Sequence, residues 1–183
     1  MKNVIFVIVI SCLSAFAGCG NRQDSKRISA LDEIQNYFDS EIKMLKTSGY
    51  TLTKNLDHKG RAEELVIDNP DWEKELVPFT ETLANQPSML QAFIKDSIVN
   101  GNSRIIQFTA NDSSATIKFL HAAFTAEKTD SIVIIKRVNN AYYTSTDTLT
   151  YYGEGNYLIK AQNLPGLGKK IGFVMSGRTN IKN

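Results

Sequence analysis

The chain has 183 residues and a formal net charge of +2, from 21 basic and 19 acidic side chains. This balance gives no case for nucleic-acid binding, which needs clustered positive charge. The two cysteines are Cys12 and Cys19, so the chain beyond position 19 has no thiol for a disulfide, a nucleophile or a thiolate metal site.

The first nineteen residues have the pattern of a secretory signal. Lys2 provides a basic start, residues 4–13 are apolar except for Ser11, and small residues follow up to Cys19. An apolar core of this length is typical of a cleaved signal and is too short to span a bilayer. We therefore expect residues 1–18 to be a signal peptide.

The end of this signal, Phe16, Ala17, Gly18 and Cys19, resembles the lipobox of bacterial lipoproteins. The resemblance implies cleavage before Cys19 and its acylation with palmitate-type chains. Several acyl chains give stable anchoring where one chain does not. Gly20, in place of Asp, implies sorting to the outer membrane of a Gram-negative bacterium, on either its periplasmic or its surface face. The alternatives are a free Cys19 after ordinary cleavage and an uncleaved anchor.

Removing residues 1–18 leaves 165 of the 183 residues, which suits a single domain with its own core. Residues 19–27 comprise the acylated cysteine and a polar stretch without a hydrophobic period. We interpret this stretch as a tether, which spans about 26–29 Å when extended. Residues 28–183 are then expected to form one α+β domain.

An amphipathic helix is predicted over residues 28–46, with Gly49 as its stop signal. Its apolar side chains recur every three or four positions, which places them on one stripe. The opposite face mixes acidic and basic residues. This favours packing on a sheet over a membrane-surface helix, whose polar face is rich in Lys and Arg. The apolar positions are Ile28, Leu31, Ile34, Phe38, Ile42 and Leu45.

Two extended runs, at residues 50–57 and 61–68, surround a glycine-containing turn and predict a β-hairpin. A second helix is predicted after them, with Asn69 as its cap. Pro78 removes a backbone donor, so we expect a kink or break there. One or two further helical turns are expected after Pro87.

From about residue 93 the pattern changes to short strands. Asn100 and Gly101, between two apolar runs, are the strongest hairpin signal in the chain. Short connections between consecutive strands exclude parallel crossovers, so an antiparallel meander is expected. The basic C-terminal end is interpreted as a solvated tail. The other predicted strands are residues 115–126, 131–138, 141–144, 148–152, 157–162 and 171–176.

Helices first and strands later predict the α+β class, with the N-terminal amphipathic helix packed on an antiparallel β-meander. Four groups of residues carry a resemblance to a known family. They are Tyr37, Phe38, Glu41, Ile42 and Leu45; Trp72, Glu75 and Leu76; Tyr143, Thr144 and Ser145; and Leu149, Tyr151 and Tyr152. Together they resemble small uncharacterised outer-membrane lipoproteins of the Bacteroidota. Pro78 departs from that family's pattern inside its second helix. The resemblance implies location and fold, and carries no activity.

Candidates for chemistry are few. His58 lies in a turn, and the alternation of His121 with Ile117 and Phe119 predicts a buried neutral side chain. Two histidines sixty-three residues apart, without a cysteine, match no metal-site spacing. No Gly-x-Ser-x-Gly, Ser-x-x-Lys or His-Glu-x-x-His motif occurs, and the glycines at residues 166–172 predict a turn. We therefore expect no catalytic, metal or cofactor site, with an enzyme as the weakest alternative.

The most suggestive feature is a cluster of five tyrosines within sixteen residues. Adjacent strand residues face opposite sides, so each Tyr-Tyr pair sends one ring to each face. The tyrosines are either strand formers that lie half in the core, or an exposed strip that binds a partner, glycan or lipid. The cluster comprises Tyr142, Tyr143, Tyr151, Tyr152 and Tyr157.

These observations predict a membrane-anchored envelope lipoprotein that serves as a non-catalytic binding or interaction module. Its expected partners are the membrane, through acyl chains on Cys19, and another envelope protein. The alternative is a carrier or sensor of an apolar, lipid-like ligand, because a helix laid across an antiparallel sheet can enclose a pocket.

Overall fold

The computed structural model describes residues 22–84, 93–126 and 128–181, with only the backbone described at 22–30 and 95. The predicted signal peptide, Cys19 with its lipobox, and the helical turns expected after Pro87 lie outside these ranges. The described elements are α1 (Arg22–Ser48), β1 (Tyr50–His58), β2 (Arg61–Ile67), α2 (Trp72–Glu75), α3 (Val77–Ala84), β3 (Phe93–Asn100), β4 (Ser103–Ala110), β5 (Ile117–Thr125), β6 (Lys128–Asn139), β7 (Tyr143–Gly153), β8 (Asn156–Pro165) and β9 (Ile171–Ile181).

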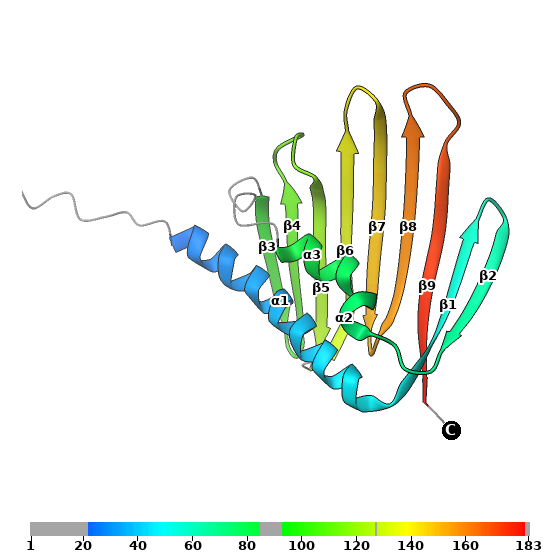
Figure 1. The fold of residues 1–183 in the computed structure, drawn as a ribbon. Helices are drawn as coiled ribbons and strands as arrows, with labels where there is room; N and C mark the ends of the chain where they lie inside the picture. The colour runs from blue at the N-terminus through cyan, green and yellow to red at the C-terminus, as the bar shows by residue number, and fades with distance from the viewer. Residues whose placement is uncertain (1–21, 85–92, 127, 182–183) are drawn as a thin grey trace, which may run out of the picture.

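The strands form one open antiparallel sheet (Figure 1). β3 to β9 follow one another as a meander, and the β1–β2 hairpin adds to β9, giving the order β2-β1-β9-β8-β7-β6-β5-β4-β3. The edges of the sheet are therefore β2 and β3. A mainly antiparallel sheet with a few helices confirms the coarse prediction of the fold class.

Local signals in the sequence account for the hairpins and the broken second helix. The β1–β2 and β3–β4 hairpins form as predicted, and Gly101 has a φ of +56° in the turn of the second. The helical segment is interrupted at Leu76, between α2 and α3, near Pro78. The predicted cap is wrong: Asp71, not Asn69, caps α2, and its carboxylate accepts a hydrogen bond from the Lys74 N–H at 3.3 Å.

Three predicted boundaries are also wrong. α1 begins at Arg22, so residues 22–27 of the predicted tether are helical. The runs at 141–144 and 148–152 are parts of one strand, β7, which begins at Tyr143, because residues 145–147 continue the ladder with β6 and β8. β9 extends to Ile181 and pairs with both β1 and β8, so this part of the predicted C-terminal tail lies inside the sheet.

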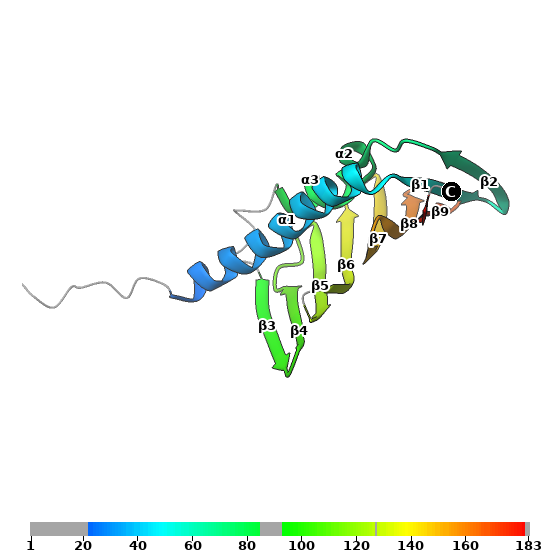
Figure 2. The same cartoon turned by 90° about the horizontal axis from the view of Figure 1, so that it is seen from below.

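The hydrophobic core combines side chains of the helices with one face of the sheet, which we call the front face. Leu149 and Tyr151 are buried on this face. Phe38 of α1 and Phe79 of α3 are also buried, and their ring centroids lie 5.2 and 5.5 Å from that of Tyr151. The three helices lie on one side of the sheet (Figure 2).

A β-bulge in β5 decides which of its side chains join the core. The register with β6 shifts between Ile117 and Phe119, which reverses the alternation. Leu120 and Ala122 are therefore buried on the front face. His121 lies on the opposite, back face, where its ring stacks on Phe119 with centroids 6.1 Å apart. The prediction that His121 points inward is wrong because Ile117 precedes the bulge.

Candidate functional site

The structure separates the five clustered tyrosines into two groups. Tyr151 and Tyr157 pair across β7 and β8 and are 0% and 2% exposed. Tyr142, Tyr143 and Tyr152 are 82%, 40% and 50% exposed. The cluster is therefore not one exposed strip: two of its members are core residues, and binding by the other three stays a prediction.

The Tyr151 hydroxyl belongs to a buried polar network that joins α1 to the β7–β8 turn. It donates a hydrogen bond to Glu41 Oε1 at 2.7 Å and accepts one from the Gly155 N–H at 2.8 Å. The Glu154 N–H donates to the same Glu41 oxygen at 2.5 Å. Burial, reinforced by the Glu41 carboxylate, raises the pKa of Tyr151 far above its ordinary value. The hydroxyl is thus a fixed donor rather than an acid–base group for neutral pH.

A second network holds Tyr157 in the same manner. Its hydroxyl donates to Glu75 Oε2 at 3.1 Å, and Lys54 Nζ lies 2.8 Å from the same oxygen. Burial first, and then the Glu75 charge, raise the pKa of Tyr157. Lys54 and Glu75 are both largely shielded from solvent, so the pair is screened less than a surface ion pair. These contacts give both core tyrosines structural roles.

The best candidate for a binding surface is an open part of the front face on β2, β1 and β9. We call it the front-face patch; it comprises Leu56, Leu65, Ile171, Phe173 and Met175. Leu65, Ile171 and Phe173 are 59%, 42% and 37% exposed. Exposed apolar side chains that gather in one place are typical of interaction sites, whereas scattered ones are ordinary.

Strand register makes the patch continuous with the core. Met175 pairs with Leu56 on one side and with the buried Ile159 on the other. Ile171, Phe173 and Met175 alternate along β9, so all three point to the front. The patch thus extends the core surface across strands that the described helices leave exposed.

The sequence carried a signal for this patch that our prediction missed. Residues 171–175 alternate large apolar side chains with glycine and valine, and Leu56 and Leu65 flank the predicted hairpin turn. Their gathering depends on β9 pairing with β1, which is a contact between residues more than a hundred positions apart. Neighbouring residues do not encode such a pairing.

An enclosed pocket for an apolar ligand is not formed by the described core. Six apolar side chains line one small cavity of about 10 Å³, which is at most the space that one water needs. Its walls are Leu31, Leu83, Phe93, Phe108, Ile117 and Leu120. A lipid-sized ligand requires hundreds of Å³, so this cavity in the described core does not enclose one.

The remaining predicted groups are not assembled into a reactive site. His58 lies at the exposed end of β1, whereas His121 is half-buried on the back face. Across residues 22–84, 93–126 and 128–181, no three side chains of His, Cys, Asp or Glu are grouped to hold a metal ion. No helix in the same ranges is both long and apolar enough to cross a membrane.

The fold and surface thus define a class: an open antiparallel sheet with helices on one side and an exposed apolar patch beyond them. No protein-family model matches the sequence, and a search of curated proteins finds no match.

Proposed function

We propose that this protein is a lipid-anchored component of the outer membrane of a Gram-negative bacterium and serves as a non-catalytic binding module. Its binding surface is the front-face patch, and the occupant is another protein of the envelope. The anchor rests on the lipobox-like residues that end at Cys19, and the location rests on the family resemblance. The observation that carries the binding role is the exposure of Phe173 beside Leu56 and Met175.

The composition of the patch suits a protein partner. Aromatic residues and Met are enriched at the centres of protein interfaces, and charged residues are enriched at their rims. Phe173 and Met175 supply the centre. On the edge strand β2, Glu63 and Arg61 alternate with Leu65 and face the same side, so the complementary surface is expected to be apolar with a rim of both charges.

The proposal includes α1 as a permanent layer on the meander rather than a helix that leaves it to bind a membrane. The hydrogen bond between Tyr151 and Glu41 supports this, as does the contact of Phe38 with Tyr151. Separating α1 from the sheet would expose Phe38 and would leave the Glu41 carboxylate without these partners. The open patch, not the face of α1, is then the surface available for binding.

Site-specific photocrosslinking in the native membrane tests the protein partner. A photoreactive phenylalanine analogue is placed at Phe173, and as a matched control at Val174. The two residues adjoin on β9, are 37% and 40% exposed, and face opposite sides of the sheet. We expect a discrete protein adduct from position 173 and none from position 174. Equal adducts from both positions, or no adduct from 173, would contradict the proposal.

A carrier of an apolar ligand is the second candidate, and continuity of the patch with the core through Met175 favours it. Native mass spectrometry of the full chain, released gently from detergent, separates the two candidates. A bound mass of several hundred daltons that is reduced by Phe173→Ser but not by Val174→Ser identifies a carrier. A bare protein mass together with the crosslinked adduct identifies a protein-binding module.

A further inference from the structure

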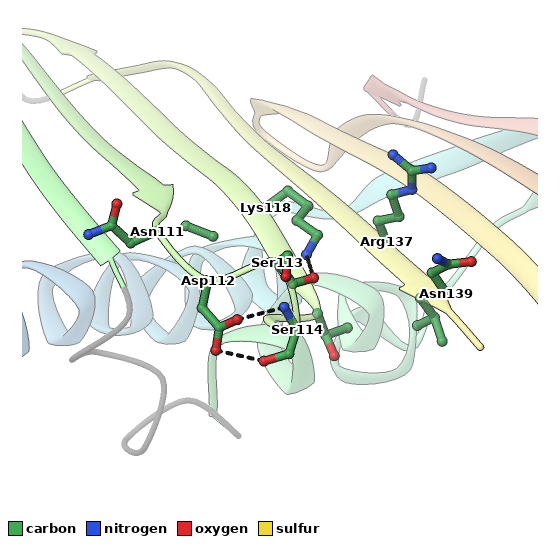
Figure 3. Close-up of a pocket in the computed structure, with 10 residues that line it drawn as sticks. Asn111, Asp112, Ser113, Ser114, Lys118, Arg137 and Asn139 are labelled. Atoms are coloured by element: carbon green, nitrogen blue, oxygen red, sulfur yellow. Dashed lines mark hydrogen bonds between the residues drawn. The ribbon is translucent and has the colours of Figure 1, made fainter.

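A polar groove of about 640 Å³ lies at the end of the sheet where the β4–β5 loop meets the start of β5 and the end of β6 (Figure 3). It shares no residue with the front-face patch. Its volume falls in the range of small-molecule sites. The side chains that matter for the following argument are Asp112, Ser114, Lys118, Arg137 and Asn139.

Among the described residues that line the groove, Asp112 is the one acidic side chain, and its carboxylate is hydrogen-bonded within its own loop. Asp112 Oδ1 accepts the Ser114 N–H at 2.7 Å, and Oδ2 accepts the Ser114 hydroxyl at 2.6 Å. These hydrogen bonds lower the pKa of Asp112, so the carboxylate stays ionised at neutral pH. Asp112 keeps its negative charge and interacts with the charge of Lys118, so it offsets one of the two cations of the groove.

The cationic side chains of the groove, Lys118 and Arg137, have N–H donors that are not used in hydrogen bonds with the described residues. Lys118 Nζ donates to the Ser113 carbonyl oxygen at 2.6 Å and keeps two further N–H groups. The Arg137 guanidinium forms no hydrogen bond or ion pair within the described ranges, although its neighbours are polar. Two positive charges against one negative charge leave the groove with a net positive charge and with unused N–H donors.

The amide of Asn139 adds to this excess. Its Oδ1 accepts a hydrogen bond from the Thr144 hydroxyl at 2.7 Å, which fixes the orientation of the amide. With its oxygen engaged, the amide nitrogen has two N–H groups for which the described residues provide no acceptor. Asn139 is therefore a neutral donor beside the cations.

Backbone contacts between β5 and β6 hold the strands that carry the side chains of the groove. The bulge between Ile117 and Phe119 falls at Lys118, and bulges commonly re-aim a side chain. The Arg137 N–H donates to the Thr116 carbonyl at 2.7 Å, which holds the loop against β6. Lys118, at the bulge, and Arg137 extend from the neighbouring strands β5 and β6, which pair on both sides of the bulge (Figure 3).

We propose that this groove binds an acidic sugar, with Arg137 and Lys118 holding its carboxylate or phosphate group. A guanidinium suits the two oxygens of such a group, and the amide of Asn139 and the hydroxyl of Thr116 suit sugar hydroxyls. The source of the sugar is a soluble glycan or the headgroup of a lipid. The assignment is independent of the front-face patch and of its partner.

Binding is measured by amide NMR shifts on the full-length protein in a neutral detergent, with glucuronate, glucose 6-phosphate and glucose as probes. We expect the two acidic sugars to shift resonances of the β4–β5 loop and the end of β6, and neutral glucose to bind more weakly. Arg137→Gln and Lys118→Gln each weaken the acidic probes by roughly tenfold, as expected for loss of one charge-assisted hydrogen bond.

Arg178→Gln is the matched control, because Arg178 is an exposed arginine of β9 outside the groove. It leaves the affinity unchanged. Lipid nanodiscs that contain a glucuronosyl diacylglycerol distinguish the source: shifts of the same resonances that Arg137→Gln abolishes indicate a headgroup, and their absence beside sugar binding indicates a soluble glycan. Equal binding of glucose, an equal loss in the control variant, or no shift with any probe would overturn the assignment.

Discussion

The front face of the sheet has two parts that follow the same alternation but differ in what covers them. Around the β7–β8 turn, Tyr151 and Tyr157 are buried, and each hydroxyl donates to a helix carboxylate, Glu41 or Glu75. Toward the opposite end of β9, Phe173 and Ile171 are exposed. The two parts therefore differ in their contacts with the helices. In the covered part, hydrogen bonds join strand tyrosines to helix carboxylates, whereas no such hydrogen bond reaches Ile171 or Phe173 from the described residues.

The largest expected difference between the two parts is seen at alkaline pH, where the covered part should unfold. Burial raises the pKa of Tyr37, Tyr151 and Tyr157 above the ordinary value near 10. Near pH 10 these tyrosines ionise in the unfolded chain but stay protonated in the folded chain. Their contribution to the free energy of unfolding is therefore fully present below pH 10 and falls as the pH rises above it. Tyrosinate absorbance and circular dichroism, recorded together, should show these tyrosines ionising as the fold is lost. Their ionisation in the intact fold would show that the covered part is open to water.

The next effect compares two phenylalanines, one in each part. Phe38 is 0% exposed and Phe173 is 37% exposed. Phe38→Ala should lower the free energy of unfolding by about 3–5 kcal/mol, because a large cavity remains. Phe173→Ala should cost about 1 kcal/mol or less. Urea unfolding of both variants measures the difference, and similar losses would mean that the open part is covered in solution.

A smaller effect concerns the turn beneath Trp72 in the covered part. Gly155 has a φ of +79°, and a Cβ there would meet Thr179 Cγ2 at 2.7 Å and the Trp72 ring at 2.9 Å. Gly155→Ala should therefore cost about 2–3 kcal/mol, from backbone strain and overpacking together. Gly60→Ala is the control, since Gly60 has a φ of +76° with nothing within 4 Å.

In the control only the strain remains, about 1 kcal/mol. Thermal unfolding of both variants isolates the contribution of packing against Trp72. If Gly60→Ala destabilised the protein as much as Gly155→Ala, crowding by Trp72 and Thr179 would not contribute.

Much of this architecture could be predicted from local sequence, because its signals lie within a few residues. Such signals predicted three features: helix α1 from its helical period, two hairpins from their turn glycines, and the break in the second helical segment from Pro78. The bulge in β5 could not be predicted, and it moved His121 to the back face. The continuous strand β7 was predicted as two strands because residues 145–147, Ser-Thr-Asp, are polar and carry no apolar alternation.

The candidate sites depend more strongly on distant contacts. Alternation alone correctly assigns Tyr151 and Tyr152 to opposite faces, but it does not say which face the helices cover. That is decided by pairs such as Tyr151 with Glu41, which are 110 residues apart. The front-face patch likewise requires β9 to pair with β1. Patterns within one strand therefore identified the tyrosine cluster but did not predict which of its side chains are buried.

The smallest effect is expected from two substitutions that each remove one tyrosine hydroxyl, one in the covered part and one outside it. In Tyr151→Phe, Glu41 and the Gly155 N–H lose a hydrogen-bond partner in a buried place, which should cost about 1–3 kcal/mol. In Tyr143→Phe, the lost hydroxyl belongs to a side chain that is 40% exposed and has no hydrogen-bond partner for its hydroxyl in the described residues. That change should stay within about 0.5 kcal/mol.

Urea unfolding of the two variants gives a direct measure of how much the helix carboxylates stabilise the covered part. The rings are retained in both variants, so differences in apolar burial do not enter. A loss in Tyr151→Phe that matched Tyr143→Phe would mean that water replaces Glu41 as a partner. The network would then not hold α1 on the sheet, and the face of α1 would join the front-face patch as a surface open to binding.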